Sequence, residues 1–270
     1  MDRYRLKNII ILILVLVNAF LLASLIVRKT SEYNARKLAV TQLVELFAAD
    51  EITLSPDAIS TDTPPSSRVL TRDTALDREV AAFFLGSDLS SSDQGGDIYT
   101  YSSSRGAAIF RENGSFDAAG TLSTEDPAGF CREFGRKFSY SEPTFRQEDD
   151  GSETATMVRN CNRLPVFNCT VTFTFRSGTL VNVSGTLLPE NYTELTGEEA
   201  PLSASAALTA FLEARRQSFA AVSAITDLYL CYELQSTTAS SMMTLVPAWC
   251  IVTDTAKYYV NCSTGAVVSA

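Results

Sequence analysis

Six cysteines are the residues of this chain whose side chains could most readily take part in a reaction, and all of them follow residue 130. Two pairs have a spacing that suits neighbouring positions on paired β-strands: Cys161 with Cys169, and Cys250 with Cys262. Cysteines pair into structural disulfides in oxidising compartments, whereas single cysteines pack inside proteins as small hydrophobic side chains. The sequence therefore leaves two interpretations of these four residues, candidate disulfides or buried thiols.

Histidine is absent from the chain, and this absence removes most hydrolytic chemistry. Ser-His-Asp and Cys-His catalysis both need an imidazole base, and most catalytic zinc sites use histidine ligands. The acidic clusters at residues 148–150 and 198–199 lack the alternating ligand spacing of a calcium loop. The chain also has no glycine-rich phosphate loop. We therefore expect a protein that is not an enzyme, with no metal site and no small-molecule cofactor.

One polar residue interrupts an apolar segment: Asn18 lies near the middle of residues 8–27, which carry no charge. About 20 helical residues at ~1.5 Å each span the ~30 Å hydrocarbon core of a bilayer. An asparagine amide in hydrocarbon has no water to bond, but a second helix can hydrogen-bond it. Asn18 is therefore a candidate contact with the membrane helix of a partner.

The apolar segment predicts a permanent anchor rather than a cleaved signal peptide. The apolar region of a signal peptide has ~7–15 residues and ends in small residues, whereas this segment is longer and ends in large ones before Arg28 and Lys29. Cations flank it on both sides, so the charge rule does not decide the orientation. Because the part that precedes it is short, we expect residues 1–29 to be a cytoplasmic start and an anchor. The chain would then cross the cell membrane once, with its C-terminal domain extracytoplasmic.

The charge of the whole chain indicates which partners to exclude. The net charge is −9 and the isoelectric point is about 4.7. These values argue against binding to nucleic acid, because phosphates attract basic surfaces. Residues 30–67 are predicted to form a helical stalk that continues the anchor, followed from residue 50 by a linker that contains Pro56, Pro64 and Pro65.

Beyond the linker, helical and strand patterns alternate. Helices are predicted at residues 74–85, from residue 127, and at residues 204–217, and Asp73, Asp126 and Ser203 occupy their N-cap positions. Segments of strand character follow each helix.

A helix that buries one stripe can cover one face of an antiparallel sheet. The fold class is therefore predicted as α+β: one N-terminal transmembrane helix, followed by repeated lobes of antiparallel sheet that are each covered by a helix. We expect a first α+β region at residues 68–195 and a C-terminal lobe at residues 196–270.

The second and third of these units are similar in sequence. Residues 165–169 (PVFNC) match residues 247–250 (PAWC), and residues 180–185 match residues 259–265, with an offset of 78 to 82. A chance succession of strands would not keep such a register. The similarity predicts an internal duplication in which both halves have the same strand order.

The start and the end of the chain resemble a known family. The basic start MDRYRLKNI, the anchor stretch LVLVNAFLL and the closing segment LVPAWCIVTDTAKYYVNCSTGAVV look like those of YycI. YycI and its relative YycH are accessory regulators of an essential cell-wall sensor histidine kinase in Gram-positive bacteria. The closing segment also resembles the end of PepSY-type modules. The residues that match are Pro247, Trp249, Tyr258, Tyr259, Val260, Asn261, Thr264 and Gly265.

The resemblance implies a function in regulation. A YycI-like protein would bind the sensor histidine kinase, a sister regulator in the membrane, or both, and would adjust kinase activity without catalysis of its own. Asn261 and Ala266 replace acidic residues of the PepSY pattern, which removes a charge-based role there but keeps the hairpin. The alternative is a PepSY-like inhibitory or ligand-binding module that acts on a secreted peptidase or cell-wall enzyme.

Overall fold

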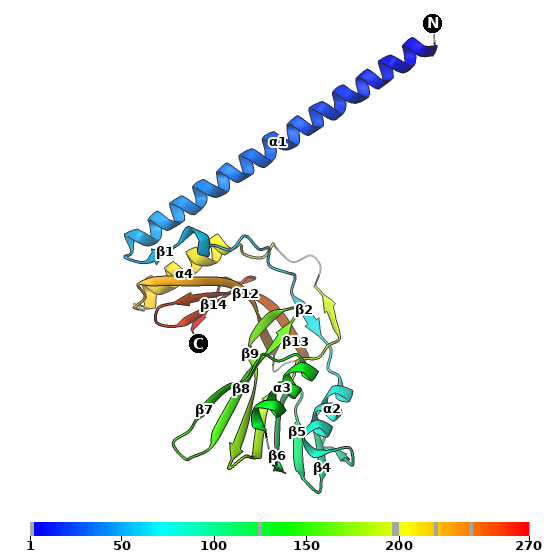
Figure 1. Cartoon of the computed structure of the whole chain (residues 1–270), viewed down its shortest axis with the longest axis vertical. Coiled ribbons are helices and arrows are strands. Elements are labelled where there is room, and N and C mark those ends of the chain that lie inside the picture. The colour runs from blue at the N-terminus through cyan, green and yellow to red at the C-terminus, as the bar shows by residue number, and fades with distance from the viewer. Residues whose placement is uncertain (1–2, 124–125, 196–199, 219–220, 238–239, 270) are drawn as a thin grey trace.

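The longest element is α1 (Arg3–Ala49), a single helix of 47 residues that projects from the rest of the molecule (Figure 1). The computed structural model describes residues 3–123, 126–195, 200–218, 221–237 and 240–269. Within α1, the stretch Leu12–Ser31 is long and apolar enough to cross a membrane, and none of it is buried. This stretch overlaps the predicted segment 8–27. The predicted anchor and the helical part of the stalk are therefore one uninterrupted helix.

The first lobe, residues 72–190, consists of two units of the same design, a helix followed by an antiparallel meander of four strands. The first unit comprises α2 (Thr74–Leu85), β3 (Ser90–Asp93), β4 (Tyr99–Ser103), β5 (Gly106–Phe110) and β6 (Ser115–Ser123). The second unit comprises α3 (Pro127–Phe138), β7 (Thr144–Gln147), β8 (Glu153–Cys161), β9 (Leu164–Arg176) and β10 (Thr179–Thr186). β6 pairs with β10, so the two meanders form one sheet in the order β3-β4-β5-β6-β10-β9-β8-β7.

The C-terminal lobe is built around a third unit with the same order of elements. It comprises α4 (Ala204–Ser218), β12 (Ala224–Thr237), β13 (Ser240–Thr253), β14 (Lys257–Asn261) and β15 (Val267–Ser269). Three short strands complete its sheet: β1 (Thr53–Leu54) beside β12, β2 (Arg68–Leu70) beside β13, and β11 (Tyr192–Glu194) beside β2. A short 3-10 turn, η1 (Pro56–Ala58), follows β1. The predicted α+β class and its repeated helix-on-sheet lobes are confirmed.

Local signals set the starts of the three helices as predicted. The Asp73 carboxylate accepts a hydrogen bond from the backbone N–H of Ala75 at 2.9 Å, and Asp126 accepts one from Gly129 at 2.8 Å. The Ser203 hydroxyl accepts one from Ala206 at 3.4 Å. These bonds satisfy N–H groups that have no partner inside the first helical turn.

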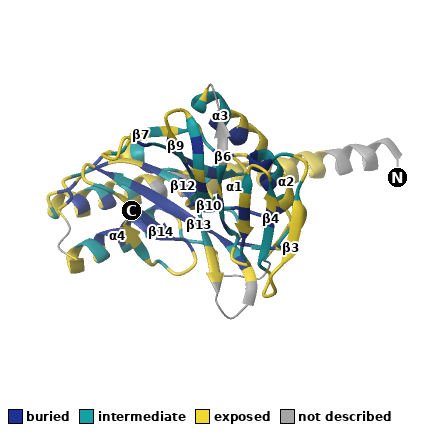
Figure 2. Cartoon of the chain, turned by 90° about the horizontal axis from the view of Figure 1, so that it is seen from below, coloured by how far each residue is buried: buried dark blue, intermediate teal, exposed yellow. Residues whose placement is uncertain are grey.

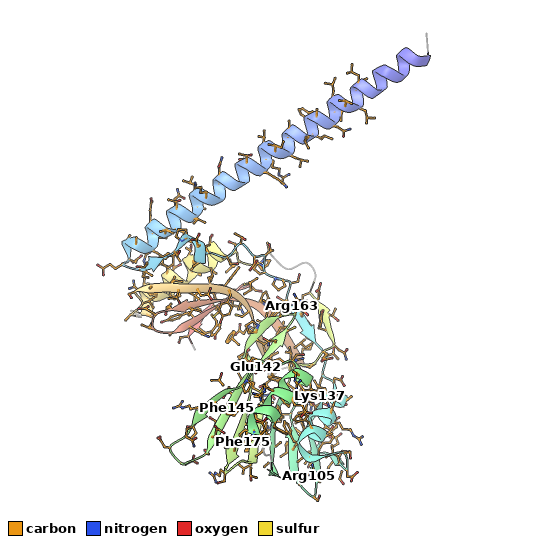
Figure 3. The ribbon with its side chains drawn as sticks, viewed as in Figure 1. Arg105, Lys137, Glu142, Phe145, Arg163 and Phe175 are labelled. Atoms are coloured by element: carbon orange, nitrogen blue, oxygen red, sulfur yellow. The ribbon has the colours of Figure 1, made fainter. Side chains whose placement is uncertain are left out.

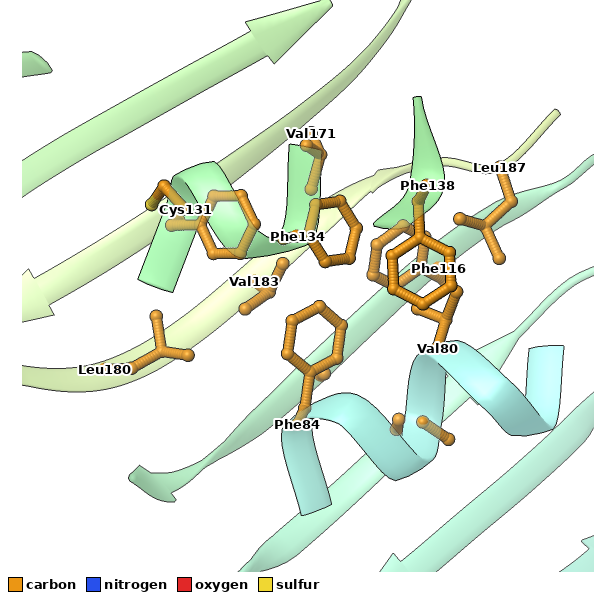
Figure 4. Packing of buried hydrophobic residues seen from close by; sticks show 14 of the residues in the cluster. Val80, Phe84, Phe116, Cys131, Phe134, Phe138, Val171, Leu180, Val183 and Leu187 are labelled. Atoms are coloured by element: carbon orange, nitrogen blue, oxygen red, sulfur yellow. The ribbon is translucent and has the colours of Figure 1, made fainter. Parts of the chain in front are cut away.

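The core of the first lobe lies between its two helices and one face of its sheet (Figure 4). Phe84 of α2 and Phe134 of α3 stack with ring centroids 5.5 Å apart, and both contact Phe173 of β9. Figure 4 shows these helix residues directed toward Val171 and Val183 of the sheet. The other face and the edge strand β3 are more exposed (Figure 2).

The order of elements agrees with the predicted duplication, because α3 and α4 are each followed by a meander of four strands. The spacing does not follow that order: α4 begins 77 residues after α3, but β13, the second strand of its unit, begins 76 residues after β9, the third strand of its unit. One residue match was wrong, however. Pro165 is the second residue of β9, whereas Pro247 is the eighth residue of β13. The similarity of the two proline-containing stretches does not reflect equivalent places in the two units.

The segment after α1 has little regular structure, as expected of a linker, but it is packed rather than free. Ile52, Leu54 and Ile59 are buried in the core of the C-terminal lobe. Leu43 and Phe47, near the end of α1, belong to the same core. The C-terminal lobe therefore includes the end of the stalk, β1, β2 and β11, and its limits differ from the predicted range 196–270.

Strand β9 joins the two lobes. Its first half lies beside β12 with Val166 opposite Tyr232, and its second half belongs to the sheet of the first lobe. The Asn168 side chain extends this pairing: its amide N–H donates to the Leu234 carbonyl at 2.7 Å, and its oxygen accepts from the Leu234 N–H at 2.8 Å. The sheet is therefore continuous from one lobe to the other.

Candidate functional surfaces

The part of α1 that is long and apolar enough to span a membrane carries Asn18 on its exposed surface. Asn18 and Phe47 are ~8 helical turns apart at 3.6 residues per turn, so their side chains point to the same side of α1. Phe47 faces the core of the C-terminal lobe. The candidate membrane contact therefore lies on the side of α1 that, farther along, packs against this lobe.

One face of the C-terminal sheet is not covered by any of the helices that the structure describes. Its opposite face packs against α4 through Trp249, Ile251 and Val260. On the open face, the Phe167 ring of β9 stacks on the Tyr259 ring of β14, with centroids 3.7 Å apart and planes 8° apart. The stack covers a small buried cluster. That cluster comprises Cys231, Ala248 and Cys250, flanked by Tyr229 and Val252.

The two candidate disulfides were wrong, and all six cysteines are free thiols. The register places Tyr259, not Cys262, opposite Cys250. Cys262 lies three residues beyond Tyr259, and an odd separation along a strand directs side chains to opposite faces. Cys262 accordingly packs in the core beneath α4, while Cys250 belongs to the open face.

The predicted disulfide between Cys161 and Cys169 is excluded for a different reason. Cys161 ends β8 opposite Leu164, next to the tight turn at Asn162 and Arg163, while Cys169 lies five residues farther along β9. At ~3.3 Å per residue this offset is ~16 Å, well beyond the ~7 Å limit for the Cα atoms of a disulfide. The Cys169 thiol instead donates to the Thr186 carbonyl at 3.2 Å.

Five of the six thiols are buried, and burial lowers their reactivity. Burial raises the pKa of Cys131, Cys169 and Cys262 to about 12, and it raises the thiol pKa of Cys231 and Cys250 as well. A thiol reacts through its thiolate, so these five are inert near neutral pH. Cys161 is the exception, because its side chain is half-buried.

The residues that resemble the PepSY pattern support the hairpin of β13 and β14. Trp249 is fully buried, and its indole N–H donates to the Leu202 carbonyl at 2.9 Å. The Asn261 side-chain oxygen accepts from the N–H groups of Ser263 and Thr264 at 2.9 and 3.0 Å. Gly265 follows with φ of +72°, which favours glycine. These positions stabilise a turn and a core.

The part of the chain that the structure describes contains no group of three or more acidic, cysteine or histidine side chains that could hold a metal ion. A cavity lined by Phe84, Arg105 and Asn182 has a volume of about 20 Å³. This volume suits a single water molecule.

Sequence reasoning missed a cluster around Arg68 where the two lobes meet. The Arg68 side chain is only 8% exposed and lies 3.3 Å from the Glu194 carboxylate. Its guanidinium stacks on the Tyr192 ring at 4.2 Å, and its Nη1 lies 3.7 Å from the Cys161 sulfur. Arg68 and Cys161 are 93 residues apart in the chain, so no local pattern could have linked them.

Comparisons with known proteins complete this description. No protein-family model matches the chain, and no curated protein matches it. Among solved structures, an uncharacterized protein from Eubacterium rectale is similar over 76% of this chain and 86% of its own, with 11% sequence identity and a TM-score of 0.46.

Proposed function

We propose that this chain is a membrane-anchored, non-catalytic regulator whose extracytoplasmic lobes adjust the activity of a sensor kinase in the same membrane. A sister regulator is a further partner in this proposal. The N-terminus lies in the cytoplasm, and residues beyond the anchor lie outside.

One observation carries the proposal: the membrane helix enters the core of the C-terminal lobe without a break. α1 is helical from Arg3 to Ala49, and Leu43 and Phe47 are buried among residues of α4 and β13. Beside them, Asp50 forms an ion pair with Arg216 of α4. A helix fixed at one end in a packed core transmits a tilt or rotation of the lobe to its membrane span. This is what regulation across a bilayer requires.

Breaking the stalk tests this coupling. Ala35 is exposed and lies between the membrane span and the first buried residue of the lobe. Proline within a helix removes a hydrogen bond and clashes with the preceding turn, at a cost of about 3 kcal/mol. The variant Ala35→Pro should insert, fold its lobes and still co-purify with the kinase, but should lose its effect on kinase autophosphorylation in liposomes. Ala35→Ser is the matched control and should regulate normally. Full regulation by the proline variant would disprove the coupling.

The membrane contact is tested at Asn18. A hydrogen bond between membrane helices contributes about 0.6–2 kcal/mol. The variant Asn18→Leu should therefore weaken co-purification with the kinase or sister regulator by about 3- to 30-fold. Leu22→Val, one turn away, is the control and should bind normally. Protease added outside intact cells should digest the lobes of both variants, as the proposed orientation requires. Unchanged association of the Asn18 variant would leave the outer lobes as the binding surface.

The open face of the C-terminal sheet favours a second candidate, a module that binds a secreted peptidase or cell-wall enzyme. The stacked rings of Phe167 and Tyr259 beside half-buried Tyr229 are the kind of aromatic surface that protein interfaces use. Co-purification with a soluble enzyme by the lobes alone, without the anchor, would favour this function over the first.

A further inference from the structure

We propose that Cys161 is a site of reversible thiol–disulfide exchange with negatively charged, low-molecular-weight disulfides, and that Arg68 is its positioning residue. The inference is independent of the proposed regulatory function. It rests on the exposure of one thiol among six, on the guanidinium beside it, and on the placement of both at the junction of the lobes.

Access distinguishes Cys161 from the other cysteines. It ends β8, and the next two residues, Asn162 and Arg163, form a tight turn with φ of +49° and +68°. Both turn residues are exposed, and Figure 3 places Arg163 where the two lobes meet. Because Cys161 is half-buried beside this exposed turn, a small reagent would reach its sulfur from the turn.

The second observation is the state of Arg68. Its side chain is more than nine-tenths buried, and its Nε has no hydrogen-bond partner among the residues that the structure describes. Its Nη1 lies 3.7 Å from the Cys161 sulfur, a distance typical of a charge-assisted contact to sulfur. When the Asn162 amide is oriented to match its neighbours, its oxygen accepts from both Nη atoms at 2.6 and 2.9 Å. The guanidinium is therefore held against the sulfur, with one donor still unused.

The charges around the sulfur favour an anionic reagent. Glu194 of β11 faces the same guanidinium at 3.3 Å, but its side chain is 57% exposed, so solvent screens it. The Tyr192 and Tyr232 rings, from β11 and β12, lie against the guanidinium with their centroids at 4.2 and 5.9 Å. Arg163 adds an exposed cation at the turn, which solvent screens in the same way. Arg68 and Arg163 are two cations against the one carboxylate of Glu194, so the net charge of these three groups is positive.

The reaction balances without a further oxidant. The Cys161 thiolate attacks one sulfur of the small disulfide, whose S–S bond breaks as the new Cys161 S–S bond forms. The other half leaves as a thiolate and takes a proton from water. One disulfide is consumed and one is formed, and a small free thiol reverses the step. Because Arg68 belongs to the C-terminal sheet and Cys161 to the first lobe, the adduct forms between the lobes.

The test uses the full-length protein in detergent with two disulfides of opposite charge, the dianion 5,5′-dithiobis(2-nitrobenzoate) and the dication cystamine. One thiol per folded chain should react, and mass spectrometry should place the adduct on Cys161. Cys161→Ser should abolish it, and the other five thiols should react only on unfolding. Arg68→Gln should slow the dianion about tenfold and slow cystamine less. Arg68→Lys should restore most of the rate, and Arg105→Gln should change nothing.

Several outcomes would overturn the proposal. They are reaction at a different cysteine, cystamine reacting faster than the dianion with the unaltered protein, and an Arg68→Gln variant with unchanged rate and charge preference. The reagent comparison needs no variant, so it decides the question even where Arg68→Gln fails to fold.

Discussion

Replacing Phe47 with alanine is expected to lower the free energy of unfolding of the C-terminal lobe by about 3–5 kcal/mol, the usual cost of emptying a buried phenylalanine site. Phe47 is fully buried in the core that contains Phe211 and Trp249. Trp249 is the only tryptophan of the chain, so its fluorescence during chemical denaturation reports on this core. The variant should also detach the end of α1 from the lobe, and should therefore regulate a partner as poorly as Ala35→Pro.

Leu46 provides the matched control for Phe47. It is the preceding residue of the same helix, but its side chain is 39% exposed. Leu46→Ala should therefore change the free energy of unfolding by less than about 1 kcal/mol and leave regulation intact. Equal destabilisation by the two substitutions would mean that α1 is not anchored through Phe47.

Replacing Trp249 with alanine should have the largest effect of any single substitution considered for this chain. The change removes a fully buried indole, at a cost of about 3–5 kcal/mol, and leaves the Leu202 carbonyl without its donor, at a further cost of about 1–3 kcal/mol. Trp249→Phe keeps most of the volume and should mainly show the second cost. Circular dichroism during urea denaturation measures both.

The Trp249 variants also test whether this residue stabilises the core or binds a partner. Met242 lies on the same strand with its side chain 55% exposed, so Met242→Ala should change stability by less than about 0.5 kcal/mol. If Trp249→Ala kept its stability but lost binding to a partner, the tryptophan would be a recognition residue rather than the centre of a core.

The proposed placement in the membrane would limit how a partner can approach. Asn18 shares its side of α1 with Phe47, and near the end of α1 this side is covered by the C-terminal lobe. A partner helix that bonds Asn18 would therefore meet the lobe soon after it leaves the membrane. Contact in the bilayer and contact outside it would then act on the same face of α1.

Much of the fold could be predicted from short-range patterns. The apolar segment around Asn18 predicted a helix that is long and apolar enough to span a membrane, because length and hydropathy alone decide whether a helix can do so. Asp73, Asp126 and Ser203 marked the helix starts, because a cap bonds only to the turn that follows it. The recurrence of helix and strands predicted three similar units, and the chain order of the meanders confirmed it.

Only the tertiary structure decided what depends on strand register and on contacts between distant segments. Cys250 and Cys262 lie on opposite faces because the hairpin places Tyr259 opposite Cys250, and a shift of one residue would have reversed this. The stalk and linker are packed because Phe47 and Ile52 meet α4, far along the chain. Arg68 meets Cys161 only because β2 and the β8–β9 turn converge at the junction of the lobes. The sequence by itself therefore determined the long apolar helix, the helix starts and the α+β class, whose signals are local. Long-range packing decided which thiol is least buried and how the end of α1 is held.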